Sequence, residues 1–525
     1  MTSVETAPPS AAWATEPFVV GTPEQFRRLR DWLKSIEFTD EAICRKAGIT
    51  NVALLPSLRV RKSPFEKPVD ALSLLVQLFL DSERISWTVV RSILSEDELS
   101  ILGDLGLLQS SVTNQDLCIT TVALIPSEDL YIASDRLTNI ETIGSVPADL
   151  VYSTVTAETR QFVALMPRIP CESYLEMCAG TGIAALHAAK GFAKQAYSAD
   201  ITERSTRFAQ FNAALNGLDN FTAVQGDLYD PVAGQTFDLI TAHPPYVPSE
   251  QTEMVFRDGG SDGEQITRRI IAGLGEHLRP GGLFYLDCVM TDRGADPIEQ
   301  RIRRMLGPME EEFDVLVVRG GLADAKHFQA ERLQSGRLSP EAFMRQSELF
   351  KRLGVERLIG VTTLIQRRAT PRPVITKQRT LSAGTRPEDL LWLLRYLSET
   401  VEWGAEQSAR VLDCKPVALT HAELRVRSVL RDGVWAAVDA KIETVAPFST
   451  ASPCPQWFPT LLSRCDGRIT LREHLERLRA DGAVPESATP DDFVEVMLEL
   501  AAVPFFEIEL FPIPPSPQGK ASNVA

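Results

Sequence analysis

The stretch YLEMCAGTGIAALHAA, from Tyr174 to Ala189, has the pattern of a buried β-strand that enters a glycine-rich turn and continues as an α-helix. Gly180 and Gly182 let the backbone approach a ligand closely, and the N–H groups at the start of the helix would face that ligand. A single turn of this kind also suits a dinucleotide, or no ligand at all where the turn is merely tight. The pattern here is E-x-C-x-G-x-G, with Glu176 ahead of the turn, rather than G-x-G-x-x-G.

Acidic residues also end the two strands that follow. SADITERS places Asp200 at the end of the next predicted strand, where a carboxylate can accept hydrogen bonds from both hydroxyls of a ribose. VQGDLYDP ends the third strand with Asp227, which could accept from an adenine amino group with Leu228 beside the ring. One aspartate at a strand end is usually a cap or turn residue, but three acidic strand ends in successive β-α units indicate a nucleoside-type ligand.

Strands and helices alternate between about Asp149 and Arg368. This order predicts an α/β fold with a mostly parallel, doubly wound, Rossmann-like sheet of seven strands. Ligands of such sheets bind beyond the carboxyl ends of the strands, so the informative residues should lie there. The predicted strands are 173–177, 195–200, 221–227, 237–243, 283–290, 313–320 and 356–367.

Length and composition limit the remaining possibilities. A chain of 525 residues suggests about three domains at roughly 150 residues each. The formal charge of −16 disfavours non-specific attachment to nucleic acid or to an anionic membrane, although a local basic patch remains open. The eight cysteines form no C-x-x-C pair, which disfavours a zinc or disulfide framework and fits a reducing cytoplasm; no metal site is predicted. The longest apolar stretch, near Ala71 to Leu80, is too short to span a membrane.

The regions on either side of the α/β segment have different patterns. Helical spacing from Thr22 to about Leu108 precedes two β-like runs at 117–126 and 129–135, which suggests a winged-helix-like unit. Such a unit could contact nucleic acid, but the acidic chain favours a substrate-holding or dimerising cap. The C-terminal region could dock a partner or serve as a stabilising or dimerising module. The predicted parts are a disordered tail (1–20), the winged-helix-like domain (21–148), the α/β domain (149–368), a linker (369–385), an α+β accessory domain (386–511) and a second disordered tail (512–525).

A fourth motif, HPPYVPS at 243–249, completes an ordered set with EMCAGTG, SAD and GDLYDP. This set resembles the class I S-adenosylmethionine-dependent methyltransferases. More narrowly it resembles their HemK-like group, which includes the glutamine methyltransferases of release factors and ribosomal proteins. The later segments FRDGGSDGEQITRRI and HLRPGGLFYLD are similar to that group's D-G-G-x-D-G segment and to its strand after P-G-G. The resemblance covers roughly Asp149 to Met290 and does not extend to the flanking regions.

The resemblance implies S-adenosyl-L-methionine as the cofactor and assigns a set of contacts to matching positions. Glu176 and the two turn glycines would surround the methionine part, Asp200 would hold the ribose, and Asp227 would contact the adenine. Cys178 stands where the group has its first glycine, and nothing nearby in the sequence would activate it as a nucleophile. VYSTVTAETRQ, with Thr156, Glu158 and Thr159, matches a segment of the same pocket. The predicted cofactor-binding residues are Glu176, Cys178, Gly180, Gly182, Asp200, Ile201, Asp227, Leu228 and His243.

The sequence departs from the group at His243. The group's signature is Asn-Pro-Pro-Tyr, in which the amide oxygen and a backbone carbonyl accept hydrogen bonds from a planar NH₂ and the tyrosine ring stacks on it. Here the carbonyl of Pro244 and the ring of Tyr246 remain, but an imidazole replaces the amide. An imidazole can copy the amide as an acceptor, or it can take a proton and act as a general base on a hydroxyl, an amine or an acidic carbon. The site could also bind the cofactor without catalysis. The predicted catalytic residues are His243, Pro244 and Tyr246.

Several functions are therefore open, and those that are enzymatic depend on methyl transfer by in-line displacement. The favoured one is an N-methyltransferase of a protein or peptide, with the flanking regions gripping the acceptor and a homodimer allowed. A second is an O-, N- or C-methyltransferase of a small metabolite that uses His243 as its base. A third is a non-catalytic cofactor-binding module, and nucleic-acid methylation is disfavoured by the −16 charge. Asp262 is expected to stabilise a turn. The histidines expected to be structural or at the surface are His187, His277, His327, His421 and His474.

Overall fold

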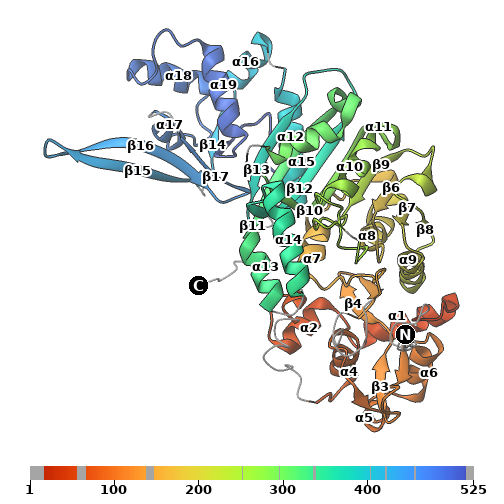
Figure 1. The fold of residues 1–525 in the computed structure, drawn as a ribbon. Helices are drawn as coiled ribbons and strands as arrows, with labels where there is room; N and C mark the ends of the chain where they lie inside the picture. The colour runs from red at the N-terminus through yellow and green to blue at the C-terminus, as the bar shows by residue number, and fades with distance from the viewer. Residues whose placement is uncertain are drawn as a thin grey trace. The chain divides into compact units, whose positions relative to one another are not determined.

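The computed structural model describes residues 17–55, 67–136, 147–250, 252–294, 296–334, 339–402, 404–419, 422–453 and 457–515. The chain packs as two compact units, whose elements are labelled in Figure 1. Unit 1 consists of Met1–Arg293 and Asp324–Glu356, and unit 2 of Gly294–Ala323 and Arg357–Ala525. Residues 1–16 and 516–525 of the predicted tails lie outside the described residues, as do His421 and Cys454.

The centre of unit 1 is a parallel β-sheet with the strand order β8-β7-β6-β9-β10. The chain enters at β6, winds outward through β7 to β8, and then returns to the other side of β6 through β9 to β10. The order therefore reverses between β6 and β9, which is the switch point where α/β sheets bind ligands. The first five predicted strands are confirmed, with ends that differ by a few residues. Their bounds are β6 Cys171–Met177, β7 Ala193–Asp200, β8 Phe221–Gln225, β9 Phe237–Ala242 and β10 Leu278–Asp292.

Helices connect these strands, and their ends follow from local sequence. Helix α9 (Glu203–Asn216) begins after Thr202, whose hydroxyl accepts from the N–H of Ser205, and it ends at Gly217 with φ +65°. Helix α8 (Ile183–Gly191) is rich in alanine, and small side chains allow it to be buried almost entirely against the sheet. The connection from β9 to β10 contains α10 (Gln265–Ala272) and α11 (Leu274–His277).

The N-terminal region of unit 1 combines helices with two small antiparallel sheets. The sheets are β1-β3-β2 and the hairpin β4-β5. The range 117–126, predicted as one β run, forms two strands in different sheets, because the chain turns at Thr121, whose hydroxyl donates to the carbonyl of Gly106. The bounds are α1 Pro23–Ser35, α2 Asp40–Ala47, α4 Ala71–Leu75, α5 Trp87–Ile93, α6 Glu96–Asp104, β1 Ile85–Ser86, β2 Leu108–Ser110, β3 Leu117–Thr120, β4 Ala123–Ser127 and β5 Leu130–Ser134, with single turns at Val52–Leu54 and Val76–Leu80.

This N-terminal region packs directly on helix α9. The ring of Phe18 lies 4.9 Å from that of Phe208 and 4.4 Å from that of Phe211. Arg30 donates to the carbonyls of Ala214 and Leu215. These carbonyls belong to the last turn of the helix, where no N–H of a following helical turn can pair with them. The two regions on either side of the predicted boundary near residue 148 thus share one hydrophobic core in unit 1.

Two further helices of unit 1 come from an insertion between strands of unit 2. Helices α13 (Ala325–Gln334) and α14 (Pro340–Leu353) pack against each other (Figure 1) and belong to unit 1. Helix α14 begins after Ser339, whose hydroxyl accepts from the N–H of Ala342, and it ends at Gly354 with φ +67°. The predicted alternation of strands and helices implies helical structure between residues 320 and 356, but not two helices packed within unit 1.

Unit 2 contains the strand order β12-β11-β13-β17-β16-β15 and is mixed in direction. The sixth and seventh predicted strands are confirmed as β11 and β12. The prediction of a linker over 369–385 is wrong, because residues 376–381 form β13, which pairs in parallel with β11 from Val315–Thr376 to Arg319–Thr380. The range is rich in proline and charge and has little apolar character, so its strand is stabilised by backbone pairing that a residue pattern does not reveal.

The remaining elements of unit 2 agree with a mixed α/β composition. Strands β15 and β16 form a long antiparallel hairpin (Figure 1). The bounds are α12 Ile298–Met305, β11 Phe313–Asp324, β12 Arg357–Arg367, β13 Thr376–Leu381, α15 Pro387–Thr400, α16 Ala405–Leu412, β14 Val417–Ala418, β15 Ala422–Arg431, β16 Val434–Thr444, β17 Phe448–Pro453, α17 Phe458–Leu462, α18 Leu471–Ala480, α19 Pro490–Ala501 and β18 Phe506–Glu507. Among the described residues, no helix has both the length and the apolar character that crossing a membrane requires.

Candidate functional site

The loop between β6 and α8 has an unusual backbone. Cys178, Gly180 and Gly182 all have positive φ, at 53°, 53° and 75°. A Cβ on Gly180 would meet no atom within 4 Å, so this residue borders open space. A Cβ on Gly182 would come within 3.1 Å of both Ala209 and Phe221, so that glycine is required by the close approach of α9 and β8. The two turn glycines therefore have different physical roles.

Glu176, at the end of β6, is buried beneath this loop. Its Oε2 accepts a hydrogen bond of 2.8 Å from the backbone N–H of Ala185, in the first turn of α8. Burial raises the pKa of Glu176 to about 8, although the backbone N–H groups of Ala185 and Ala184 act in the opposite direction. The carboxyl group is thus predominantly protonated at neutral pH, and it satisfies a donor that the helix start leaves without a partner.

Asp200, at the end of β7, ties the loop to the neighbouring strand. Its Oδ2 accepts from the N–H of Gly180 at 2.9 Å, and its Oδ1 accepts from the N–H and the hydroxyl of Thr202 at 3.0 and 3.2 Å. Since each carboxylate oxygen can accept two hydrogen bonds, Oδ2 retains capacity for one more donor. Ile201, the next residue, exposes 53% of its surface.

The carboxylate of Asp227, just after β8, forms an ion pair within the protein. Its two carboxylate oxygens accept from the guanidinium of Arg269, on α10, at 3.1 and 2.9 Å. Both side chains are more than 40% exposed, so water screens this pair. Leu228, which follows, adopts φ +52°, a strained value for a branched side chain. Arg269 would therefore compete with the hydrogen bond that an adenine amino group is predicted to donate to Asp227, and the sequence did not reveal this.

His243 directly follows β9, and the structure fixes its orientation. The imidazole Nδ1 lies 2.6 Å from the backbone carbonyl oxygen of Asp287, on β10. A carbonyl only accepts, so Nδ1 carries the hydrogen and Nε2 carries the lone pair. Burial lowers the pKa of His243, and the Asp287 carbonyl and the charge of Glu158 offset this only in part. At neutral pH the ring is therefore neutral, with Nε2 as an acceptor.

Helix α7 (Ala157–Leu165) supplies the surroundings of this imidazole. The ring of Phe162 lies 5.3 Å from that of His243, and Tyr246 approaches from another side at 6.3 Å with a nearly perpendicular ring. Burial also raises the pKa of Tyr246, so its hydroxyl stays protonated. Glu158, on the first turn of α7, acts electrostatically on both His243 and Tyr246. The segment VYSTVTAETRQ thus lies beside the His-Pro-Pro-Tyr loop that follows β9.

Two residues of this cluster were missed by sequence reasoning, namely Phe162 and Asp287. The side chain of Asp287 is buried, and it accepts from the amide Nε2 of Gln161 at 3.2 Å. The signal was present in part, because Gln161 ends one of the quoted segments and LFYLD ends at Asp287. A backbone carbonyl as the partner of an imidazole has no residue signature, so only the tertiary structure identifies it.

The D-G-G-x-D-G segment, residues 258–263, packs on the His-Pro-Pro-Tyr loop. A Cβ on Gly259 would lie 2.7 Å from the carbonyl oxygen of Pro245 and 2.9 Å from the Cα of Tyr246, so only glycine fits there. Asp262 accepts from the N–H of Glu264 at 2.9 Å and pairs with Arg268 at 2.6 Å, which is the turn-stabilising role expected of it. The segment thereby fixes the backbone of the His-Pro-Pro-Tyr loop.

The strand order brings the predicted site residues to one edge of the sheet. Glu176, Asp200, Asp227 and His243 follow or end the adjacent strands β6, β7, β8 and β9. Within the described ranges, no group of three or more His, Cys, Asp or Glu side chains could hold a metal ion. Of the remaining histidines that the structure describes, three are buried and one is exposed: His187, His277 and His474, and His327 respectively.

Comparison with known proteins agrees with this geometry. Residues 151–312 match the family model "Methyltransferase small domain". The ribosomal protein uL3 glutamine methyltransferase of Bradyrhizobium diazoefficiens is 36% identical over 124 residues, which are 21% of this chain and 39% of that protein. The release factor glutamine methyltransferase of Thermodesulfovibrio yellowstonii is 30% identical over 125 residues (22% and 45%). That of Moorella thermoacetica is 33% identical over 146 residues (25% and 51%).

The chain spans about half the length of these relatives or less, so the likeness concerns the matched segment alone. Residues 151–312, which the family model matches, contain the glycine-rich loop, the three acidic strand ends and the His-Pro-Pro-Tyr loop. In strand order, loop geometry and sequence, residues 151–312 are thus similar to the methyltransferase small domain and to part of the glutamine methyltransferases named above.

Proposed function

We propose that this domain transfers a methyl group from S-adenosylmethionine to a nitrogen atom of a protein or peptide acceptor. The observation that carries the proposal is the orientation of His243, whose Nδ1 donates to the Asp287 carbonyl and whose Nε2 is left as an acceptor at the end of β9. An acceptor at this place can hold an N–H group of the substrate, as the amide of Asn-Pro-Pro-Tyr would.

The residues present fit the cofactor. Open space at Gly180, the exposed Ile201 and the remaining capacity of Asp200 Oδ2 suit a ligand that brings hydroxyl and amino donors and an apolar ring. When bound, S-adenosylmethionine supplies an electrophilic methyl group on a positively charged sulfur. We infer that the residues around it are Glu176, Cys178, Gly180, Gly182, Asp200, Ile201, Asp227, Leu228 and His243.

The residues of the loop after β9 position the acceptor. His243 Nε2 and the backbone carbonyl of Pro244 accept hydrogen bonds from the acceptor nitrogen, which directs the nitrogen lone pair toward the methyl group, and Tyr246 packs on the acceptor plane. Methyl transfer would form the new N–C bond while the electron pair of the broken C–S bond stays on sulfur and S-adenosylhomocysteine leaves, and the nitrogen would lose a proton. The neutral imidazole can receive that proton at Nε2, since its lowered pKa leaves the lone pair free at pH 7.

A methyltransferase of a small metabolite is the second candidate. The pairing of His243 Nδ1 with a carbonyl is also the arrangement by which general-base histidines are oriented, and it would suit the removal of a proton from a hydroxyl or an acidic carbon. The sequence likeness to protein glutamine methyltransferases favours the protein acceptor.

The proposal includes the bounds of the domain and the roles of the regions that flank it. The domain would extend over residues 149–368 with β11 and β12 as its sixth and seventh strands, and regions 21–148 and 386–511 would flank it and capture the acceptor. The packing of Phe18 on Phe208 and Phe211 supports a fixed place for the first of these regions within unit 1.

The test is a labelling assay in which the full chain and methyl-tritiated S-adenosylmethionine are added to an extract of the source cell. We expect label in macromolecular protein that protease removes and nuclease does not. Label in the low-molecular-weight fraction alone would establish the metabolite reaction instead. Asp200→Ala should abolish cofactor binding in calorimetry, and binding without any label in an extract would leave only a cofactor-binding module.

A further inference from the structure

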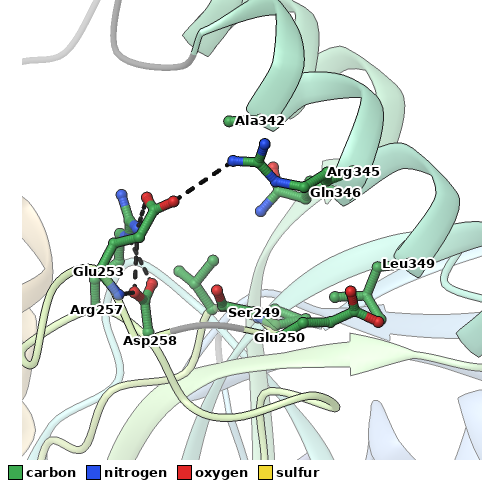
Figure 2. A pocket seen from close by; sticks show the side chains of 11 residues that line it. Ser249, Glu250, Glu253, Arg257, Asp258, Ala342, Arg345, Gln346 and Leu349 are labelled. Carbon is green, nitrogen blue, oxygen red and sulfur yellow. Dashed lines mark hydrogen bonds and ion pairs between the residues drawn. The ribbon is translucent and has the colours of Figure 1, made fainter. Parts of the chain in front are cut away.

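The pocket of unit 1 that adjoins the His-Pro-Pro-Tyr loop has balanced charges along its lining (Figure 2). Glu253 pairs with Arg257 at 3.1 Å and with Arg345 at 3.6 Å. Glu250 pairs with Arg352 at 2.6 Å. The pocket therefore favours no charged ligand. By contrast, unit 2 exposes a row of apolar side chains on the hairpin of β15 and β16.

This hairpin separates its charged side chains from its uncharged ones. Successive side chains of a strand point to opposite faces, and residues paired across antiparallel strands share a face. All charged side chains of β15 and β16, from Glu423 to Glu443, lie on one face. The other face, here called the apolar face, includes Leu424, Val426, Ser428 and Leu430 of β15 and Trp435 and Ala440 of β16.

The apolar face is covered at its inner end and open farther out. Ile442, near the inner end, is buried, and β17 pairs with β16 from Lys441 to Thr444. Beyond this point Trp435 exposes 70% of its surface, and Val426 and Leu430 each expose more than half. Figure 1 shows the far end of the hairpin beyond the other labelled elements of unit 2. A two-stranded ribbon is at most marginally stable alone, and apolar side chains gathered on one face indicate contact with another molecule.

The open part of the apolar face has the length that a second copy of the hairpin would cover. It extends along β15 from Leu424, which is about half exposed, to the turn formed by Asp432 and Gly433. Ser428 stands midway between Leu424 and Asp432. A twofold axis at the level of Ser428, between two such faces and across their strands, would place the turn of one copy over Leu424 of the other. The contact would end where the open surface ends.

The side chains of this face also fit a reversed copy of themselves. On the outer side of Ser428 the face carries the large Leu430 and Trp435, and on the inner side it carries the smaller Val426 and Ala440. The same axis would bring the large side chains of each copy onto the small ones of the other. Such reciprocal contact is what a twofold interface requires, and large against small is how side chains fill space.

The charges of the hairpin do not oppose this contact. Residues 422–444 contain four basic and four acidic residues, so the hairpin is neutral within a chain of net charge −16. Repulsion between two acidic chains would therefore come from other parts of the protein, where salt screens it. The apolar face has no charged side chain with which a strongly charged partner could pair, which favours a second copy.

We propose that two copies of this chain associate through the apolar faces of their hairpins, packed face to face about a twofold axis at the level of Ser428. The two ribbons would form a small sandwich with its layers about 10 Å apart. Eight residues of strand span about 27 Å, and the face is only two strands wide, so the contact is smaller than that of an obligate dimer. We expect weak association that depends on concentration. The inference does not depend on the proposed methyl transfer.

Sedimentation equilibrium of the full chain tests the association. From about 1 to about 100 µM the mass should rise from that of one chain toward that of two. The rise should be steeper at about 0.5 M than at about 0.05 M salt, because salt screens the repulsion between acidic chains and leaves the apolar contact. A chain that stays monomeric at about 100 µM, or that dissociates as salt is added, overturns the inference.

Trp435→Asp should abolish the association, because the contact would bury a carboxylate without a partner. Val434→Asp is the matched control, since Val434 is the adjacent residue, is 68% exposed and lies on the charged face. This control should associate as the wild type does. Both positions are exposed in the single chain, so thermal unfolding at low concentration should show both variants folded. Equal association of the two variants contradicts a contact through the apolar face.

Cross-linking locates the axis. Layers about 10 Å apart are too distant for a disulfide, which needs Cα atoms within about 7 Å, so a short bismaleimide is the reagent. Ser428→Cys should give a covalent dimer above the background that the native cysteines give in the wild type. Arg427→Cys, one residue away on the charged face, should give only that background. Equal yields from the two variants would overturn the proposed packing.

Discussion

The Nδ1 atom of His243 donates a hydrogen bond of 2.6 Å to the backbone carbonyl oxygen of Asp287. This one contact selects the tautomer of the imidazole at the position where the related glutamine methyltransferase motif has an asparagine. It makes the ring an oriented acceptor, because the only nitrogen left for a substrate is Nε2.

We expect His243→Asn to retain activity within about tenfold of the wild type, because the amide oxygen can accept the same hydrogen bond. His243→Ala should lose about 10²-fold in kcat/KM, the usual effect of removing a positioned acceptor or base. Steady-state kinetics with tritiated cofactor on the labelled acceptor measures both. Equal losses in the two variants would indicate that proton removal, and not orientation, is the main role of the imidazole.

The pH profile provides a separate measurement of the same residue. Burial lowers the pKa of His243, so protonation of Nε2 should occur below the ordinary histidine value of 6.5. The kcat/KM of the wild type should therefore be constant around pH 7 and fall only as the pH drops through that lowered value. The His243→Asn profile should lack this acid limb; a limb that persists in the variant must come from another group.

Glu176 should make the stability of the fold depend on pH. Its pKa is about 8 in the folded chain, against an ordinary value of 4.5 once the chain unfolds, so between these values the folded chain holds a proton that the unfolded chain releases. Stability should therefore fall as the pH rises from about 4.5 to about 8, by at most about 5 kcal/mol. Glu176→Gln, which keeps the hydrogen bond from Ala185, should remove this loss. Thermal unfolding at pH 5 and pH 8.5 tests it, with the exposed Glu172→Gln as the control that should change nothing.

The two turn glycines should respond differently to alanine. In Gly182→Ala the new methyl group meets Ala209 and Phe221 at 3.1 Å in a left-handed backbone, which should cost about 2–4 kcal/mol of stability. In Gly180→Ala only the backbone conformation is unfavourable, at about 1–2 kcal/mol, but the methyl group enters the open space of the cofactor site. Calorimetry should then show at least about tenfold weaker cofactor binding. A fully functional Gly180→Ala protein would contradict the proposed cofactor position.

Arg269 should compete with the cofactor for Asp227. Because its guanidinium occupies both carboxylate oxygens, Arg269→Ala should free them and tighten S-adenosylmethionine binding by up to about fivefold, the value of an exposed pair. Arg268→Ala, on the same helix but paired with Asp262, is the control. Weaker binding in the Arg269 variant would mean that the guanidinium itself holds the ligand.

Local patterns were sufficient for the core of the fold. The short β-like runs that precede or end at Glu176, Asp200 and Asp227, bounded by turn residues, predict strands that lie close to β6, β7 and β8. The linker prediction at 369–385 failed for the opposite reason. Strand β13 is polar and is stabilised by backbone pairing with β11, which leaves no side-chain pattern to detect.

The sequence by itself determined which residues stand at the carboxyl ends of the strands, because the place where a strand ends depends on the local arrangement of apolar, polar and turn residues. Only the tertiary structure decided what those residues do there. The hydrogen bond that fixes the tautomer of His243 joins segments far apart in the chain, and so does the pairing of Asp227 with Arg269. Such contacts depend on distances in space and on backbone atoms, which are the same in every residue and so leave no trace in the sequence.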